Sequence, residues 1–297
     1  MVDPAQVIKL AIGVSILLLV FSLGMGATFA DATSFLRTLF RPPRQLLRAT
    51  LAMNVVVPAI AIAAVALFDM PKTVSVALLA MAVSPVPPIL PGKEMKFGGR
   101  PHYVFGLLVA VSLTAIVLTP LTVGIMGRIL DRELHIGMVD IAKLVARTIL
   151  LPLTVGMLFR KVAPNLADRL SPLVSKIAFG ILILGLLPVL YTAWPGIRIL
   201  LGNGTGMLIV GVAMAAVAAG HWIGGPDEHD RTALGIASAM RHPGIAMSIA
   251  TTNFPEDKSM PAGILLYVLI AAVVTSIYGK LRLRRVSNVL ASSAHRT

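Results

Sequence analysis

Two short segments place charged side chains beside prolines inside otherwise apolar stretches of the chain. The first is Ser84–Gly92, which holds four prolines within seven residues and is followed by Lys93 and Glu94. The second is Met240–Gly244, which reads Met-Arg-His-Pro-Gly. Prolines lack an amide hydrogen and interrupt helices. Unwound backbone then leaves free polar groups that, with the charged side chains, are able to bind an ion or a solute.

The two segments share a spacing pattern. In each, a threonine is followed eight positions later by a methionine and then, three or four positions further on, by a proline. The residues are Thr73, Met81 and Pro85 in the first segment, and Thr232, Met240 and Pro243 in the second. Broken helices at corresponding positions of two halves are typical of the binding site of a secondary transporter. A proline kink that only shapes packing is the alternative interpretation.

The composition indicates which medium surrounds these segments. Hydrophobic residues make up 57% of the 297 residues and charged residues only 13%, against about 25% charged in a soluble domain. Leu10–Ala30 and Val104–Met126 carry no charge, and a helix needs about 20 apolar residues to cross a bilayer. The sequence therefore predicts an all-α integral membrane protein whose partner is the lipid bilayer.

Nine membrane elements are predicted along the chain. They are Val7–Thr28, Leu47–Phe68, Lys72–Gly99, Tyr103–Met126, Ile141–Phe159, Leu173–Trp194, Met207–Ile223, Arg231–Phe254 and Pro261–Tyr278. The third and eighth contain the two breaks. Because the eighth element comes five places after the third, which is an odd offset, the two halves are expected to have inverted topology, with the broken helices crossing near the middle of the membrane.

Positive charge gathers in three connections and explains the net charge of +13. Arginines and lysines concentrate in residues 37–48, 160–176 and 280–285, all on one side of a nine-span topology. Cytoplasmic loops carry such an excess, so the C-terminus is expected in the cytoplasm and the N-terminus outside, in a bacterial inner membrane. This pattern accounts for the basic charge without nucleic acid as a partner.

No motif points to an enzyme or to a bound cofactor. The chain has no cysteine, which excludes disulfides, thiolate metal sites and cysteine nucleophiles. The sequence also offers no nucleotide-binding loop, nucleophile–base pair or cluster of metal ligands. We therefore expect a protein without catalytic residues, metal or cofactor.

Several ordered motifs resemble those of the bile acid:sodium symporter family. They are Phe21–Gly26, Asn54–Pro58, Ser84–Gly92, Leu150–Gly156 and Arg231–Gly244 with Asn253-Phe254 following. The resemblance implies one transporter domain over residues 1–297. It also implies a panel formed by residues 7–28, 141–159 and 173–194, and a core formed by residues 47–126 and 207–278. Movement of the panel against the core would give alternating access.

The resemblance and the breaks together define a candidate binding site. Its members are Asn54, Pro85, Lys93, Glu94, Ser112, Ala237, Arg241, His242, Pro243 and Gly244. Asn54 and Ser112 match family positions that bind sodium through an amide and a hydroxyl. For Lys93 a second interpretation stays open, in which its side chain extends to the membrane interface.

Three of these positions depart from what the resemblance implies for sodium. Ala237, Arg241 and His242 stand where sodium-using members carry an acidic residue followed by glutamine and asparagine. A fixed guanidinium repels sodium, so these residues argue against a sodium site of the usual kind and against coupling to sodium. If the breaks cross, Glu94 is able to neutralise Arg241 in a salt bridge.

Two functional hypotheses remain open at this point. The first is a secondary transporter of a small organic anion, attracted by Arg241 and the half-helix ends, with Glu94 and His242 as candidates for proton coupling. The second is a membrane sensor or assembly protein that uses a transporter scaffold without transport. Sodium or a proton is the coupling ion under the first hypothesis, and the sequence alone does not choose between them.

Overall fold

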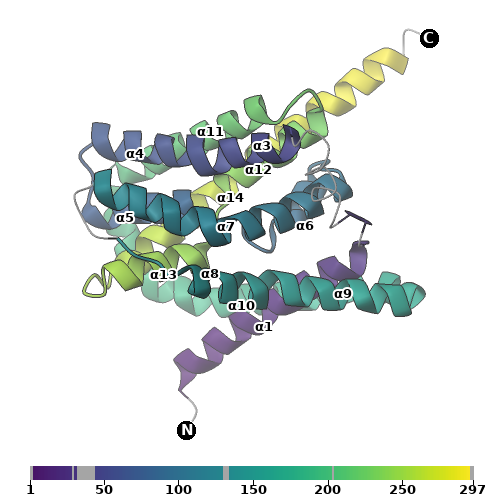
Figure 1. Ribbon diagram of the computed structural model, residues 1–297, viewed down its shortest axis with the longest axis horizontal. Coiled ribbons are helices and arrows are strands. Elements are labelled where there is room, and N and C mark those ends of the chain that lie inside the picture. Colours follow the sequence, from purple (N-terminus) through teal and green to yellow (C-terminus); the bar gives the residue numbers. More distant parts are fainter. Residues whose placement is uncertain (1–2, 29, 32–43, 130–133, 203, 295–297) are drawn as a thin grey trace.

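The computed structural model is a bundle of long, roughly parallel helices (Figure 1). It describes residues 3–28, 30–31, 44–129, 134–202 and 204–294. Within these residues the regular structure is helical, which confirms the predicted all-α class. The predicted basic segment at residues 37–43 lies outside the described residues.

Seven helices or helix runs in the described residues are long and apolar enough to cross a membrane. They are α1 (Pro4–Gly26), the run Arg44–Leu67, α7 (Pro101–Ile129), the run Met138–Val162, α10 (Pro164–Gly202), α11 (Thr205–Ile223) and α14 (Met260–Ala294). The count differs from nine because the third and eighth predicted elements are each split into two shorter helices.

The two splits fall where the prolines predict them. The third element consists of α5 (Lys72–Val83) and α6 (Leu90–Lys96), and the eighth of α12 (Glu228–Ala239) and α13 (Pro243–Asn253). Ser84 is extended, with φ −73° and ψ 148°, as expected for a residue before proline. His242 is also extended and forms the N-cap of α13. Pro243 then takes the first helical position, where its missing amide hydrogen costs nothing.

The two broken elements run in opposite directions (Figure 1). α5 packs against α13, and α6 packs against α12. We name the two ends of the bundle after the residues that begin these elements, the Lys72 end and the Glu228 end.

Two of the long runs contain a π-helical turn just before a proline. The run Arg44–Leu67 comprises α3 (Arg44–Leu51), η2 (Ala52–Val56) and α4 (Val57–Leu67), with Pro58 early in α4. The run Met138–Val162 repeats this order with α8 (Met138–Val145), η3 (Ala146–Leu150) and α9 (Leu151–Val162), and Pro152 follows η3. Such bulges often occur at functional sites.

The helix α10 is longer than predicted. It continues from Pro164 to Gly202 through three internal prolines, whereas the sequence predicts a span over Leu173–Trp194. α1 packs against both α9 and α10, and these three helices lie together on one side of the bundle (Figure 1). Glycines allow the close approach of α1 to α9, because a Cβ at Gly156 would lie 2.3 Å from the carbonyl oxygen of Phe21.

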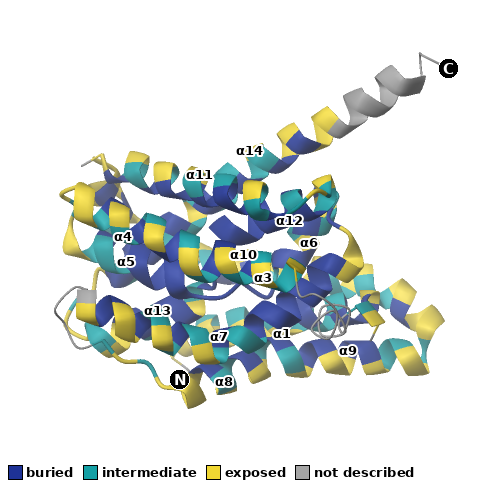
Figure 2. Cartoon of the chain, turned by 45° about the horizontal axis from the view of Figure 1, so that its top comes forward, coloured by how far each residue is buried: buried dark blue, intermediate teal, exposed yellow. Residues whose placement is uncertain are grey.

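The interior contains two main apolar clusters. One lies toward the Lys72 end and includes Leu78, Ile249 and Tyr267; the other lies toward the Glu228 end and includes Leu90 and Leu108. Exposed positions form stripes along the outer helices (Figure 2), and many of them are large apolar residues such as Leu184 and Ile199 on α10. Apolar side chains that face outward suit a protein surrounded by lipid.

A polar network holds the Glu228 end together. Glu228 pairs with Arg231 at 3.1 Å and with Arg282 of α14, while Asp227 pairs with Arg100 near the start of α7. Asp227 also caps α12 by accepting from the backbone amides of two residues in its first turn. These contacts fix the first turn of α12 against α7 and α14.

Candidate functional site

The two breaks touch through their backbones. The amide nitrogen of His242 donates to the carbonyl oxygen of Pro85 over 2.8 Å. This contact joins segments from opposite halves of the chain and places the predicted binding residues of the two breaks beside each other. We call this region the crossing, meaning residues Ser84–Ile89 and Met240–His242 with the parts of η2 and α6 that pack on them.

The first break is rich in hydrogen-bond acceptors. Pro85, Pro87 and Pro88 provide carbonyl groups but no amide hydrogens. Leu90 donates locally to the carbonyl of Pro87 over 3.0 Å. The carbonyls of Ser84 and Pro85 instead receive their donors from the second break.

Arg241 supplies the side-chain donors. Its Nη1 donates to the carbonyl oxygen of Ser84 over 3.1 Å, and its Nη2 donates to the carbonyl oxygen of Met53 in η2. The Met53 carbonyl is available because of the local sequence. In η2 the amide of Val57 donates to the carbonyl oxygen of Ala52, five residues back. The same spacing would pair the Met53 carbonyl with the amide of residue 58, but residue 58 is a proline and has no amide hydrogen.

Arg241 is buried without a carboxylate partner. The residue is 2% exposed and its Nε has no hydrogen-bond partner among the described residues. No ion pair in the described part of the chain joins it to an acidic side chain. The predicted salt bridge with Glu94 is therefore wrong for this conformation. The charge is held by main-chain carbonyl oxygens instead.

Glu94 is a second buried, incompletely bonded group. It lies on α6, is 1% exposed, and its Oε1 has no partner in the described structure. Its neighbour Lys93 points elsewhere, donating from Nζ to the carbonyl of Ala272 over 2.9 Å and to Thr275 Oγ1 over 2.7 Å. Lys93 therefore ties α6 to α14 and does not extend freely to an interface.

His242 uses one ring nitrogen structurally. Its Nδ1 accepts from the amide of Ile245 over 3.3 Å, which caps α13. Its Nε2 is buried and has no partner among the described residues. With Nδ1 as an acceptor, neutral histidine carries its hydrogen on Nε2, so an unused donor remains on the residue that follows Arg241 in the chain.

The remaining predicted site residues lie on elements around the crossing. Asn54 belongs to η2, Ser112 to α7 and Ala237 to α12, while Pro243 and Gly244 form the first turn of α13. The Asn54 amide nitrogen and the Ser112 hydroxyl are both buried without a partner in the described structure. Ala237 is fully buried and brings only a methyl group.

Some groups that matter at the crossing were not singled out from the sequence. Met53 and Ser84 act through their carbonyl oxygens, so their side-chain types give no signal. Tyr267 donates to the carbonyl of Ala239 over 3.0 Å and satisfies the end of α12. Pro88 was the available signal for Ser84, because it removes the amide that an α-helix would offer to this carbonyl. Pro58 does the same for Met53 only in the π-helical pattern of η2, which the structure shows.

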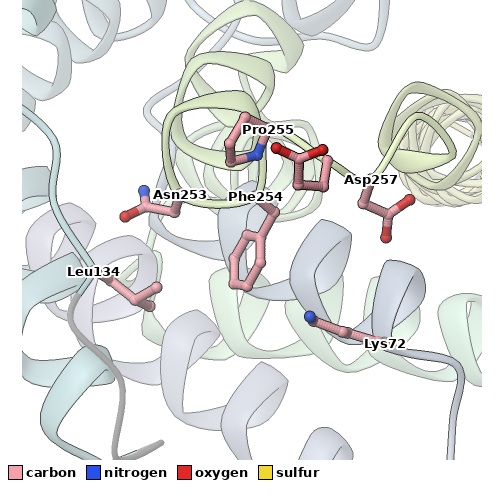
Figure 3. A pocket seen from close by; sticks show the side chains of 7 residues that line it. Lys72, Leu134, Asn253, Phe254, Pro255 and Asp257 are labelled. Carbon is pink, nitrogen blue, oxygen red and sulfur yellow. The ribbon is translucent and has the colours of Figure 1, made fainter.

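A separate cavity of about 400 Å³ opens at the Lys72 end. Figure 3 shows the Phe254 ring between the side chains of Leu134 and Lys72, and the Lys72 ammonium lies 5.2 Å from the centre of that ring. Glu256 and Asp257 also line this cavity. Hydrogen bonds from Ser259, with a further one from Thr73, hold the pKa of Asp257 below its usual value.

Comparison with known families agrees with this architecture. Residues 14–194 match the model of the sodium bile acid symporter family. The chain belongs to this family. No curated protein matches the chain. As a member of the sodium bile acid symporter family it is an integral membrane protein of a secondary-transporter type, and the family resemblance predicted from the sequence motifs is confirmed.

The matched range ends within α10. The second break, with Arg241 and His242, lies beyond residue 194 and thus outside the part that carries the family match. The residues present at the crossing do not fit a sodium ion. A methyl group at Ala237 offers no ligand, and the Arg241 guanidinium already donates to two carbonyl oxygens that face the crossing.

Proposed function

We propose that this protein is a secondary transporter that moves a small organic anion across the membrane by alternating access. The observation that carries the proposal is the positive charge of Arg241, buried at the crossing with no carboxylate partner in the described structure. Burying a charge is costly unless it is paired, so the site favours a ligand that brings a negative charge.

Other groups at the crossing favour the same ligand. The amino-terminal end of α13 contributes the positive end of its dipole, and His242 Nε2 is an unused donor beside it. An organic carboxylate or similar anion would find a full charge, a helix terminus and a side-chain donor together. These groups are buried here, so the anion reaches them only in a conformation that opens the crossing.

The proposal assigns the movement to two groups of helices. α1, α9 and α10 form the panel, and the helices around the crossing form the core. Support comes from the packing of α1 on α9 and α10 and from the antiparallel broken elements, which suit two inverted halves. In this proposal the basic Glu228 end faces the cytoplasm and the Lys72 end faces outward.

Uptake into proteoliposomes tests the proposal. The purified protein, reconstituted in liposomes, is screened against radiolabelled organic anions of increasing size, with and without sodium and proton gradients. We expect saturable uptake of at least one anion above that of empty liposomes. Absence of uptake for every anion, together with no anion-dependent change in melting temperature, would favour a non-transporting sensor or assembly protein.

Glu94 is proposed to carry a coupling proton. Its carboxyl group is buried, one oxygen has no partner among the described residues, and α6 packs against α12 beside the crossing. A carboxylate that loses water without gaining a donor is costly, so binding a proton accompanies closure around this group. His242 is the poorer candidate, since Nδ1 already caps α13.

Glu94→Gln is expected to keep anion binding but to remove the response of uptake to a proton gradient. Glutamine has the shape of the protonated acid and does not release a proton. The measurement compares initial uptake rates with and without an inward acid gradient. Glu256→Gln, at an exposed position near the Lys72 end, is the matched control and should respond like the wild type. An unchanged gradient response in Glu94→Gln would show that the proton binds elsewhere.

A further inference from the structure

The crossing has the chemistry of a cation site. Carbonyl oxygens from different elements converge there, and prolines remove the amides that would otherwise bond to them. Rings of backbone carbonyls replace the hydration shell of monovalent cations in other membrane proteins. In this chain the group held by those oxygens is the guanidinium of Arg241, which contacts the carbonyls of Met53 and Ser84.

We infer that Arg241 is a tethered cation that replaces a free sodium ion at the crossing. Its guanidinium joins η2, the first break and the second break through the two carbonyl contacts and through the backbone position that Arg241 itself occupies. A bound ion would link the same three segments. The difference is that the guanidinium is part of the chain and cannot dissociate. The contacts among η2 and the two breaks therefore do not depend on the sodium concentration.

The local sequence supports this inference from both sides. Pro58 stands where the π-helical pattern of η2 would offer an amide to the Met53 carbonyl, and Pro88 stands where an α-helix would offer one to the Ser84 carbonyl. Neither of these carbonyl oxygens therefore has a helical amide partner. Arg241 has the complementary donors in a planar fork, and a guanidinium is more weakly hydrated than an ammonium group. Burial of such a group therefore costs less than burial of a lysine at the same place.

The residues near the guanidinium also disfavour a second cation. Ala237 contributes a methyl group where the resemblance implies an acidic residue, and Glu94 makes no ion pair with Arg241 within the described structure. Among the described residues no carboxylate pairs with the guanidinium, so no ion pair offsets the repulsion between a sodium ion and this fixed positive charge.

The inference is tested by stability measurements that contain no organic anion. Their result therefore does not depend on whether the transport proposal is correct. Thermal unfolding of the purified wild type is followed in choline chloride while sodium or potassium chloride is added. We expect no sodium-specific shift in melting temperature. A saturable shift with sodium that is absent with potassium would overturn the inference.

Chemical rescue gives the positive test. Arg241→Ala leaves the Met53 and Ser84 carbonyls free, so guanidinium ion at low millimolar concentration is expected to raise the melting temperature of this variant saturably. Urea, a neutral molecule of similar shape, should not. Arg169→Ala, on the exposed surface of α10, is the matched control and should show no rescue. Equal effects of guanidinium and urea on Arg241→Ala would overturn the inference.

A second variant covers the case in which Arg241→Ala does not fold. Arg241→Lys keeps a tethered cation with a different head group. We expect it to fold, to melt below the wild type because it loses the two-pronged contact, and to show no sodium-specific shift. A sodium-specific stabilisation of Arg241→Lys would mean that the site accepts a free cation beside the tethered one, which contradicts the inference.

Discussion

Arg241→Gln is expected to abolish anion uptake and to weaken anion binding by about a hundredfold to a thousandfold. At an effective dielectric constant of about 20, two unit charges roughly 4 Å apart interact by about 4 kcal/mol, and each 1.4 kcal/mol changes a dissociation constant about tenfold. Glutamine keeps a donor that reaches one carbonyl oxygen but removes the charge. Binding is measured by titration calorimetry and uptake in proteoliposomes, with any anion that the wild type transports.

The control variant, Arg169→Gln, shows whether the effect comes from losing the charge at the crossing or only from lowering the net charge of the protein. Arg169 is exposed on α10, far along the chain from the crossing, and Arg169→Gln makes the same chemical change there. It should transport like the wild type. If Arg241→Gln retained wild-type affinity for the anion while remaining folded, the guanidinium would not be the anion-binding group and the proposed function would lose its main support.

Gly220→Val is expected to disrupt the packing of α11 on α12 and to have the largest effect on stability. A Cβ at Gly220 would lie 2.4 Å from the carbonyl oxygen of Leu234 and 2.4 Å from the Ser238 hydroxyl oxygen. Backbone on the facing helix cannot move aside as a flexible side chain does. Overpacking a well-packed interior costs about 3 kcal/mol at the upper end of the usual range, so we expect the melting temperature to fall by roughly 10 °C or the folded protein to be lost.

Gly211→Val on the same helix provides the comparison. A Cβ at Gly211 meets no atom within 4 Å, and the change in helix propensity is the same at both positions. This variant should express and melt like the wild type. Similar melting temperatures for the two valine variants would show that α11 and α12 are not in close backbone contact. The melting temperatures of both variants are measured by following the fraction of protein that stays monodisperse as the temperature is raised.

The sequence determined the membrane class and the two breaks. Uncharged apolar runs of about 20 residues are long enough to cross a bilayer as helices. Four prolines between residues 85 and 91 exclude a continuous helix there. The structure ends α5 at Val83 and begins α6 at Leu90, and it ends α12 at Ala239 and begins α13 at Pro243. Local chemistry was enough for these features because a missing amide acts within one turn of its own proline. The family was also readable from the order of short motifs.

Boundaries and continuity depended on more than local sequence. The sequence predicts a span over Leu173–Trp194, yet α10, with three internal prolines, runs from Pro164 to Gly202. Packing of α10 against α1 stabilises the helix along its length, and in membrane helices neighbouring groups compensate for the bonds that prolines remove. Tertiary contacts therefore keep α10 continuous across its prolines.

Only the tertiary structure decided what Arg241 contacts. From the sequence, the nearest compensation for its charge was Glu94, a carboxylate on the other broken element. The structure instead gives it the carbonyl oxygens of Met53 and Ser84, and a carbonyl oxygen belongs to every residue type, so no side-chain pattern identifies it. Pro88 in the sequence removes the α-helical partner of the Ser84 carbonyl, whereas Pro58 removes the partner of the Met53 carbonyl only because η2 is π-helical. Which of them lie within reach of one guanidinium follows only from the way η2 and the two breaks pack together.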